Sequence, residues 1–196
     1  MFLKVLFFFG LLLVSPIIIF SILLVFFEDG RPTIFIQERL GKNKIIIKVY
    51  KIRTMKKHTP NLGTHEVDNN NYLKVGSFLR KVKIDELPQI VNFIKNQINI
   101  IGPRPCLPNQ ADLIKLRDEY DIFSIKPGIT GLAQVLGYDM SNPKTLTKIE
   151  KIYIDKKSIK LDLLIFAATF IKGIRSNIRQ SLKSEISNIN NSYGKY

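Results

Sequence analysis

Residues 76–92 read GSFLRKVKIDELPQIVN and contain an adjacent pair of carboxylates, Asp85 and Glu86, between two helical patterns. Before the pair, apolar residues recur three or four positions apart over residues 72–83, which predicts an amphipathic helix. After the pair the same spacing returns, so we expect a second helix with Asp85 as its N-cap and Pro88 in its first turn, where proline is tolerated. Asp85 and Glu86 would then stand at a helix N-terminus, where the helix dipole favours negative charge.

Two arginines give this acidic pair a chemical context. Arg80 lies about one and a half helical turns upstream, and Arg104 lies in the sequence Gly-Pro-Arg-Pro at residues 102–105, where the prolines restrict the backbone. Taken alone, the acidic pair would be a helix cap and each arginine a partner in a surface ion pair. Taken together, a carboxylate at a helix N-terminus and forked guanidinium groups suit the binding and transfer of a phosphoryl group.

The composition indicates anionic partners and membrane contact. The chain has 196 residues with 30 Lys+Arg against 16 Asp+Glu, a formal net charge of +14, and 45% of its residues are hydrophobic. Phosphorylated substrates, acidic lipid headgroups and nucleic acid would all suit this charge, whereas membrane contact explains the charge and the hydrophobicity together. One cysteine, Cys106, and two histidines, His58 and His65, are too few for a disulfide within the chain or a zinc site.

The N-terminal segment is almost wholly apolar from Phe2 to Phe27, apart from Lys4. It exceeds the roughly 20 residues that cross a bilayer, and it is longer than the apolar region of about 7–15 residues in a signal peptide. Ser15-Pro16 lies in its middle, where proline kinks a helix. The basic residues that follow favour the cytoplasmic side. A straight span would place Lys4 outside, whereas a re-entrant helix would keep both ends inside, and the residues alone leave both alternatives open.

The rest of the chain mixes short strands with helices. Residues 33–37 and 45–50 are rich in β-branched and aromatic residues and flank turn-forming residues 41–44, which predicts a β-hairpin. Residues 161–171 are mostly apolar but too short to cross a bilayer, so a core helix and an interfacial helix are the alternatives. Residues 176–196 are polar and rich in Ser and Asn, and we expect a disordered tail.

Five segments resemble the successive signatures of the bacterial sugar transferases, the monotopic phosphoglycosyl transferases. They occur in the family's order and at family-like spacing, and the resemblance covers about residues 1–170. The chain resembles the minimal members, which have a membrane element and a catalytic domain. The five segments are GRPTIFIQERLG, KVYKIRTM, GSFLRKVKIDELPQIVN, IIGPRP and KPGITGLAQV.

The resemblance implies an activity and its partners. The family transfers a phospho-sugar from a UDP-sugar to undecaprenyl phosphate, releases UMP, and uses a covalent intermediate on the Asp of its Asp-Glu pair. Asp85 would therefore be the nucleophile and a ligand of Mg²⁺, the implied cofactor, and Glu86 would assist. Membrane lipids are a further implied partner, and we expect no nucleic-acid partner. The polar active-site positions of the family, which would hold phosphates, match Lys51, Thr54, Arg80 and Arg104.

The resemblance also implies an architecture. The fold class would be α+β and mainly helical, with a re-entrant membrane helix over residues 1–29 that breaks at Ser15-Pro16. A compact catalytic domain over residues 30–175 would contain the β-hairpin and interfacial amphipathic helices, and residues 176–196 would form the tail. The protein would be monotopic, at the cytoplasmic face of the bacterial inner membrane.

The chain departs from the family pattern in ways that leave the donor sugar open. The sequence Leu136-Gly137-Tyr138 stands where many members have Asn-Gly-Arg, and this difference could affect donor recognition. Two other functions compete with the transferase. A membrane-tethered basic binding module accounts for the charge of +14 but not for Asp85-Glu86 between arginines. A membrane phosphatase would hydrolyse the same covalent intermediate.

Overall fold

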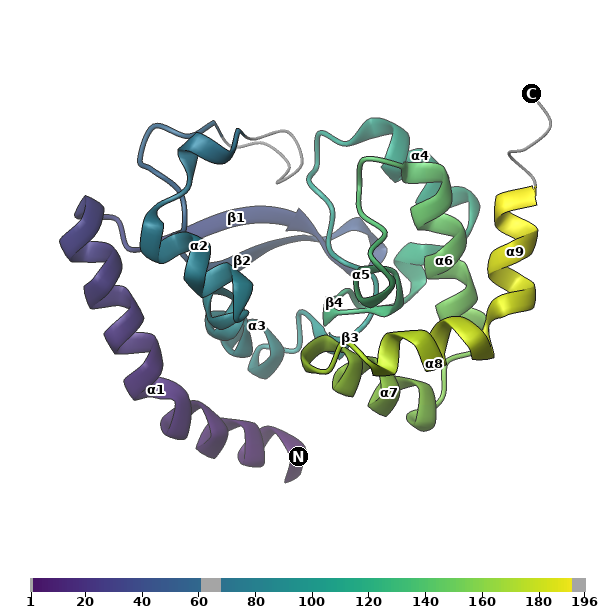
Figure 1. Ribbon diagram of the computed structural model, residues 1–196, viewed down its shortest axis with the longest axis horizontal. Helices are drawn as coiled ribbons and strands as arrows, with labels where there is room; N and C mark the ends of the chain where they lie inside the picture. The colour runs from purple at the N-terminus through teal and green to yellow at the C-terminus, as the bar shows by residue number, and fades with distance from the viewer. Residues whose placement is uncertain (1, 61–67, 192–196) are drawn as a thin grey trace. The chain divides into compact units, whose positions relative to one another are not determined.

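The chain folds into two compact units. The computed structural model describes residues 2–60 and 68–191. The first unit comprises Met1–Arg39 with Ile47–Gln97, and the second comprises Leu40–Ile46 with Ile98–Tyr196. Each unit has a hydrophobic core of its own, and helices predominate (Figure 1), so the predicted α+β, mainly helical fold class is confirmed.

The first unit combines one long helix with short helices and most of a hairpin. Its helices are α1 (Phe2–Asp29), α2 (Lys74–Lys81) and α3 (Ile90–Ile94), with 3-10 helices η3 (Asn69–Asn71) and η4 (Ile84–Gln89). Val25 of α1, Leu73 and Leu79 of the α2 region and Ile52 of the hairpin are buried together as its core. The last turns of α1 are therefore part of the folded unit, because their apolar side chains complete this core.

The predicted β-hairpin is confirmed. Its strands are β1 (Ile34–Leu40) and β2 (Ile46–Ile52), joined through the 3-10 turn η1 (Lys42–Lys44). At one end of the hairpin the N–H of Arg53 donates to the carbonyl of Thr33 over 2.8 Å. At the other end the N–H of Gly41 donates to the carbonyl of Ile45 over 2.8 Å, so the two strands are antiparallel.

The helix α1 continues across Ser15-Pro16, where the sequence predicted a helix break. Figure 1 shows α1 bending along its length. A break of the helix at Ser15-Pro16 stays a prediction. Leu13, Phe20 and Phe27 are among the exposed apolar side chains of α1. The re-entrant path of this helix through a membrane stays a prediction.

No helix in the described part of the chain combines the length and the hydropathy that crossing a membrane requires.

The second unit is built on a short pair of parallel strands covered by helices. The strands are β3 (Asn99–Ile101) and β4 (Gly128–Thr130), and Asn99 lies opposite Gly128. The helices are α4 (Ala111–Glu119), α5 (Leu132–Leu136), α6 (Pro143–Asp155), α7 (Ile159–Phe170), α8 (Ile174–Ser181) and α9 (Lys183–Asn191), with the 3-10 helix η5 (Ile122–Ser124). A Cβ atom on Gly128 would lie 2.1 Å from the backbone nitrogen of Gly102, so glycine is required where β4 meets the Gly-Pro-Arg-Pro segment.

The sequence left two alternatives for residues 161–171, a core helix and an interfacial helix, and the buried side of α7 agrees with the first. Leu161, Ile165 and Ala168 are buried in the core of the second unit, so α7 is a core helix. Its opposite side is also apolar and exposed, through Ile159, Leu163, Phe166 and Phe170. An interfacial position for that exposed side stays a prediction.

The end of the chain differs from the predicted disordered tail. Residues 176–181 and 183–191 are helical, in α8 and α9, while residues 192–196 lie outside the described residues. Ile178 and Leu182, four positions apart, are buried in the second core because they lie on one face of the helical path. The second unit therefore extends past the expected domain boundary at residue 175.

Candidate functional site

A cationic cleft lies in the first unit. Its empty volume is about 820 Å³, and its walls come from the hairpin, the segment after β2, the end of α2 and η4. Among the described lining residues, the basic ones are Arg39, Lys51, Arg53, Lys56, Lys57 and Arg80, and the acidic one is Asp85. The remaining lining residues are Pro32, Phe35, Gln37, Ile52, Thr54, Met55, Thr59 and Pro60. Such an excess of cations suits a phosphorylated ligand.

Four of the predicted site residues meet at this cleft. Lys51, Thr54, Arg80 and Asp85 all line it, although they come from three different parts of the sequence. Glu86 follows Asp85 in η4 and is itself buried. The fold thus brings the predicted nucleophile, Asp85, together with three of the four residues that were expected to hold phosphates.

The prediction that Asp85 is a helix N-cap is wrong. The 3-10 helix η4 begins at Ile84, and its N-cap position is Lys83, whose φ of 64° is left-handed. This sharp turn separates α2 from η4 and moves Asp85 into the first turn of η4, where its side chain packs inward. As a result Asp85 is only 5% exposed and Glu86 only 9% exposed.

Glu86 is paired with a lysine, whereas the pKa of Asp85 is subject to opposing electrostatic effects. The Nζ atom of Lys51 donates to Oε1 of Glu86 over 2.9 Å, in a largely buried ion pair. Burial raises the pKa of Asp85 above its ordinary value of 3.8, and the adjacent carboxylate of Glu86 raises it further. The charges of Lys51, Arg80 and Lys83 act in the opposite direction. When ionised, Asp85 is a buried anion in a basic cleft, which suits a nucleophile or a cation ligand.

Thr54 is held by a close approach of α2 to the strand segment. Its carbonyl accepts a hydrogen bond from the N–H of Leu73 over 3.1 Å. A Cβ atom on Gly76 would lie 2.2 Å from that same carbonyl oxygen, so position 76 admits no side chain. Arg80, in the last turn of α2, stacks over the ring of Tyr72 at 5.0 Å from its centroid. The cleft wall is therefore fixed on both the β2 side and the α2 side.

Sequence reasoning missed the contribution of β1 to this cleft. Phe35, Gln37 and Arg39 are alternate residues of one strand, so they share a face, and all three line the cleft. Nε and Nη2 of the buried Arg39 both donate to Oε1 of Gln37, at 2.9 and 2.5 Å. A search for alternation along β1 could have identified this face, because Phe35, Gln37 and Arg39 alternate with outward-facing Ile36 and Glu38.

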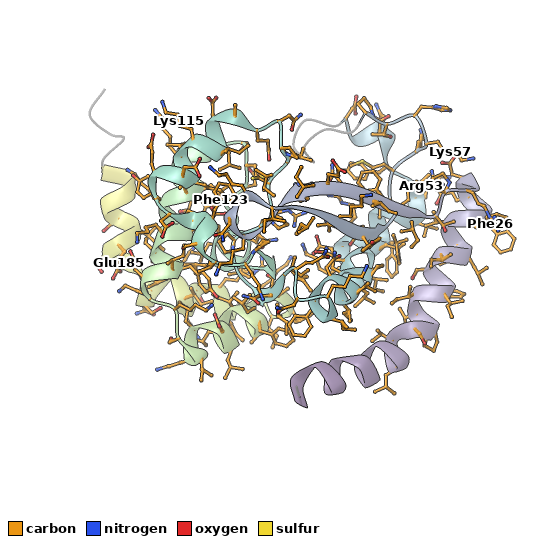
Figure 2. All side chains as sticks on the ribbon, turned by 180° about the vertical axis from the view of Figure 1, so that it is seen from behind. Phe26, Arg53, Lys57, Lys115, Phe123 and Glu185 are labelled. Carbon is orange, nitrogen blue, oxygen red and sulfur yellow. The ribbon has the colours of Figure 1, made fainter. Side chains whose placement is uncertain are left out.

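Sequence reasoning also missed Arg53 and Lys57 as lining residues of the cleft. Figure 2 shows both side chains beside Phe26, at the end of α1. Arg53 is buried, and its Nη1 donates to the carboxylate of Asp29 while its Nη2 donates to the carbonyl of Gly30 over 2.8 Å. Arg53 therefore serves two purposes, because it lines the cleft and ties the end of α1 to β2.

The other predicted site residues lie elsewhere. Arg104 belongs to the second unit, where it is partly buried, and its carbonyl accepts a hydrogen bond from Nη2 of Arg117 over 2.9 Å. Arg117 is in turn paired with Glu150, and each side chain of that pair is 2% exposed. Ser15 and Pro16 lie within α1 and are not among the lining residues of the cleft. The phosphate-binding role of Arg104 stays a prediction.

The described residues contain no group of three or more His, Cys, Asp or Glu side chains that could hold a metal ion by themselves. Mg²⁺ does not need such a group, because it commonly takes one or two carboxylates and completes its shell with substrate phosphates and water. Asp85, which lines the cleft next to Glu86, fits that requirement.

A buried acidic pair at a cationic cleft defines a phosphate-handling class of site, and comparison with known proteins agrees with it. The family of bacterial sugar transferases matches residues 2–176 of the chain. An uncharacterized sugar transferase, EpsL, of Bacillus subtilis (strain 168) is 36% identical over 164 residues, which cover 83% of this chain and 80% of that protein. The chain therefore belongs to the bacterial sugar transferase family, and it is an enzyme of the phosphoglycosyl transferase class.

Two further relatives have names that state a reaction. The UDP-glucose:undecaprenyl-phosphate glucose-1-phosphate transferase of Escherichia coli (strain K12) is 36% identical over 173 residues, covering 83% of this chain and 37% of that enzyme. The UDP-N-acetylgalactosamine-undecaprenyl-phosphate N-acetylgalactosaminephosphotransferase of Aeromonas hydrophila is 34% identical over 164 residues, covering 80% of this chain and 39% of that enzyme. The chain thus spans well under half the length of these two enzymes.

Proposed function

We propose that the chain transfers a phospho-sugar from a UDP-sugar to undecaprenyl phosphate, with release of UMP and formation of a polyprenyl-diphosphate sugar. The observation that carries the proposal is the meeting of Asp85 with Lys51, Thr54 and Arg80 at one cationic cleft. The printed reactions of the Escherichia coli and Aeromonas hydrophila relatives support it. The product would serve as the first membrane-bound intermediate of glycan assembly.

The first step forms a covalent intermediate on Asp85. A carboxylate oxygen of Asp85 attacks the phosphorus that carries the sugar, the bond from that phosphorus to the bridging oxygen breaks, and UMP leaves with the electron pair. Lys51 and Arg80 stabilise the negative charge on the phosphate oxygens, and Thr54 donates a hydrogen bond to them. Glu86 assists because its ion pair holds the ammonium of Lys51 beside Asp85.

The second step transfers the phospho-sugar to the lipid. An oxygen of undecaprenyl phosphate attacks the same phosphorus, and the bond to Asp85 breaks, which restores the free carboxylate. Arg104 is proposed to bind a substrate phosphate, for which its planar guanidinium is well suited. Asp85 would also hold Mg²⁺, which when bound supplies additional neutralisation of the donor diphosphate.

The acceptor requires contact with lipid, and the surface of the chain supports such contact. α1 exposes Leu13, Phe20 and Phe27, and α7 exposes Leu163 and Phe170. Large exposed apolar surfaces of this kind mark interaction with a membrane or a partner. We propose that α1 enters the cytoplasmic face of the bacterial inner membrane and returns to the same side through a break near Ser15-Pro16, as a monotopic anchor, and that α7 lies at the interface.

The proposal is tested by UMP release from the purified full chain in lipid nanodiscs. A panel of UDP-sugars that includes UDP-glucose and UDP-N-acetylgalactosamine is supplied with Mg²⁺, with and without undecaprenyl phosphate. We expect repeated turnover with at least one donor, only when the acceptor is present. Repeated turnover without acceptor would identify a hydrolase instead, and no turnover with any donor would contradict the transferase.

A further inference from the structure

The first turn of α2 receives its capping group from another helix. The residue at the N-cap of α2 is Leu73, whose side chain has no hydrogen-bond acceptor. Instead, Oε1 of Glu28 accepts from the N–H of Lys74 over 2.7 Å, and Oε2 of Glu28 accepts from the N–H of Val75 over 2.9 Å. One carboxylate from the last turn of α1 thus satisfies two N–H groups that the helix itself leaves unpaired.

The same helix carries Arg80 at its other end. α2 is only eight residues long, so a shift or a tilt of its first turn is passed on directly to its last turn. Arg80 lies in that last turn and lines the cleft with Asp85. Its position in the cleft wall therefore depends on how firmly the beginning of α2 is held.

The carboxylate of Glu28 is itself held in place. Val25, one turn earlier in α1, is fully buried with Leu79 of α2. Asp29, the next residue, binds the guanidinium of Arg53. Because Glu28 stands between these two fixed points, its carboxylate is presented to α2 by a rigid element and not by a mobile side chain on a loop.

We propose that Glu28 is a positioning residue for the cleft, which acts through the first turn of α2 to hold Arg80 where it binds substrate phosphate. This inference rests on the proposed function, which assigns phosphate binding to Arg80. It makes the last turn of the apolar helix α1 a working part of the site, in addition to any role of that helix in membrane attachment.

A double-mutant cycle tests the inference. UDP, which carries both phosphates of the donor class, is titrated into the full chain in nanodiscs by calorimetry. The variants are Glu28→Gln, Arg80→Ala and their combination, and Glu38→Gln is the control, because Glu38 is an exposed acid of β1. We expect Glu28→Gln to weaken UDP binding about tenfold in the wild-type background, within the usual range of coupling energies between residues of one connected network, and less than about twofold in the Arg80→Ala background.

The outcomes separate this inference from the proposed function. Equal weakening by Glu28→Gln in both backgrounds would mean a general structural role and would overturn the positioning role, while the proposed function stands. Unchanged UDP affinity in Arg80→Ala would overturn the phosphate-binding role of Arg80 and the inference with it.

If Glu28→Gln does not fold, as judged by its melting temperature, Glu28→Asp replaces it. The shorter carboxylate reaches one N–H group, so we expect about threefold weaker binding that again disappears without Arg80.

Discussion

At the scale of single residues, burial and nearby positive charge have opposite effects on the pKa of Asp85 in the cleft. Burial and the neighbouring Glu86 raise the pKa of Asp85, whereas Lys51, Arg80 and Lys83 counteract that rise. The proposed nucleophile must be ionised, so these basic residues keep the enzyme active toward lower pH. Each of them therefore affects the pH dependence through its charge, and for Lys51 and Arg80 this effect is separate from their proposed contact with substrate.

We predict that Lys51→Met shifts the acidic limb of the pH profile of kcat/KM to higher pH. The substitution removes a charge that lowers the pKa of Asp85, so the ionised form is lost at a higher pH as the solution is made acidic. The measurement is the rate of UMP release from pH 4 to pH 9 at low donor concentration.

The matched control for this prediction is Lys115→Met, because Lys115 is an exposed residue of α4 in the second unit. It should leave the acidic limb where it is in the wild type. An acidic limb of Lys51→Met that coincides with the wild type, or lies at lower pH, would show that Lys51 does not set the ionisation of Asp85.

At the scale of elements, α2 approaches the segment after β2 without a side chain between them. A Cβ atom at position 76 would lie 2.2 Å from the carbonyl oxygen of Thr54. That oxygen belongs to the backbone and also accepts the N–H of Leu73, so it cannot move away without the loss of a hydrogen bond. The approach fixes Thr54 and the start of α2 relative to each other.

We predict that Gly76→Ala destabilises the protein by about 2 kcal/mol and lowers its melting temperature by about 4–8 °C, the range expected for overpacking in a chain of this size. The control is Gly173→Ala, since Gly173 has φ −59° and a Cβ atom added there would meet nothing within 4 Å. Thermal unfolding followed by intrinsic fluorescence measures both variants. A melting temperature for Gly76→Ala equal to that of Gly173→Ala would mean that the backbones separate easily.

The sequence predicted these elements where the signal is local. Runs of β-branched and aromatic residues on either side of turn-forming residues predicted the hairpin. The spacing of Val75, Phe78 and Leu79 predicted α2, because it records which face of the helix is buried. Asp85 was misplaced because the left-handed turn at Lys83 has no sequence signal of the kind that glycine provides.

At the end of the chain, by contrast, the local sequence pattern did not predict the structure. Its Ser-rich and Asn-rich composition favours disorder, but Ile178 and Leu182 find partners in the second core that no local pattern reveals. The lining residues Lys56 and Lys57 likewise carry no local signal of a site, and only the fold brings them to the cleft. The family resemblance identified Lys51 and Thr54, which local patterns alone would have left as ordinary polar residues, whereas the position of Arg80 near Asp85 had already indicated a phosphate site.

At the scale of the whole molecule, the proposed reaction requires that a soluble nucleotide sugar and a lipid phosphate reach one aspartate. A re-entrant α1 would place both of its ends on the cytoplasmic side, and the coupling of Glu28 and Asp29 to α2 and β2 would then fix the cleft at the membrane surface. A straight span would separate Lys4 from the cleft by the full bilayer.

We predict that a cysteine at position 4, Lys4→Cys, is labelled by a membrane-impermeant maleimide in inverted membrane vesicles and not in intact spheroplasts. A cysteine at the exposed hairpin residue Ile45 is the reference for the cytoplasmic side. The native Cys106 is fully buried and should stay unlabelled in the folded protein. Labelling of Lys4→Cys from the outside of spheroplasts would contradict the re-entrant path.

The central claim is that Asp85 forms the covalent bond to the phospho-sugar. The most direct test measures the mass of the intact protein after it has reacted, without acceptor, with a UDP-sugar that supports turnover. We expect the wild type to gain the mass of one phospho-sugar and to lose it when undecaprenyl phosphate is added. Asp85→Asn should gain no mass and show no turnover, with a melting temperature close to that of the wild type because the side chains have nearly the same shape. Full labelling of Asp85→Asn, or turnover at the wild-type rate, would contradict the claim.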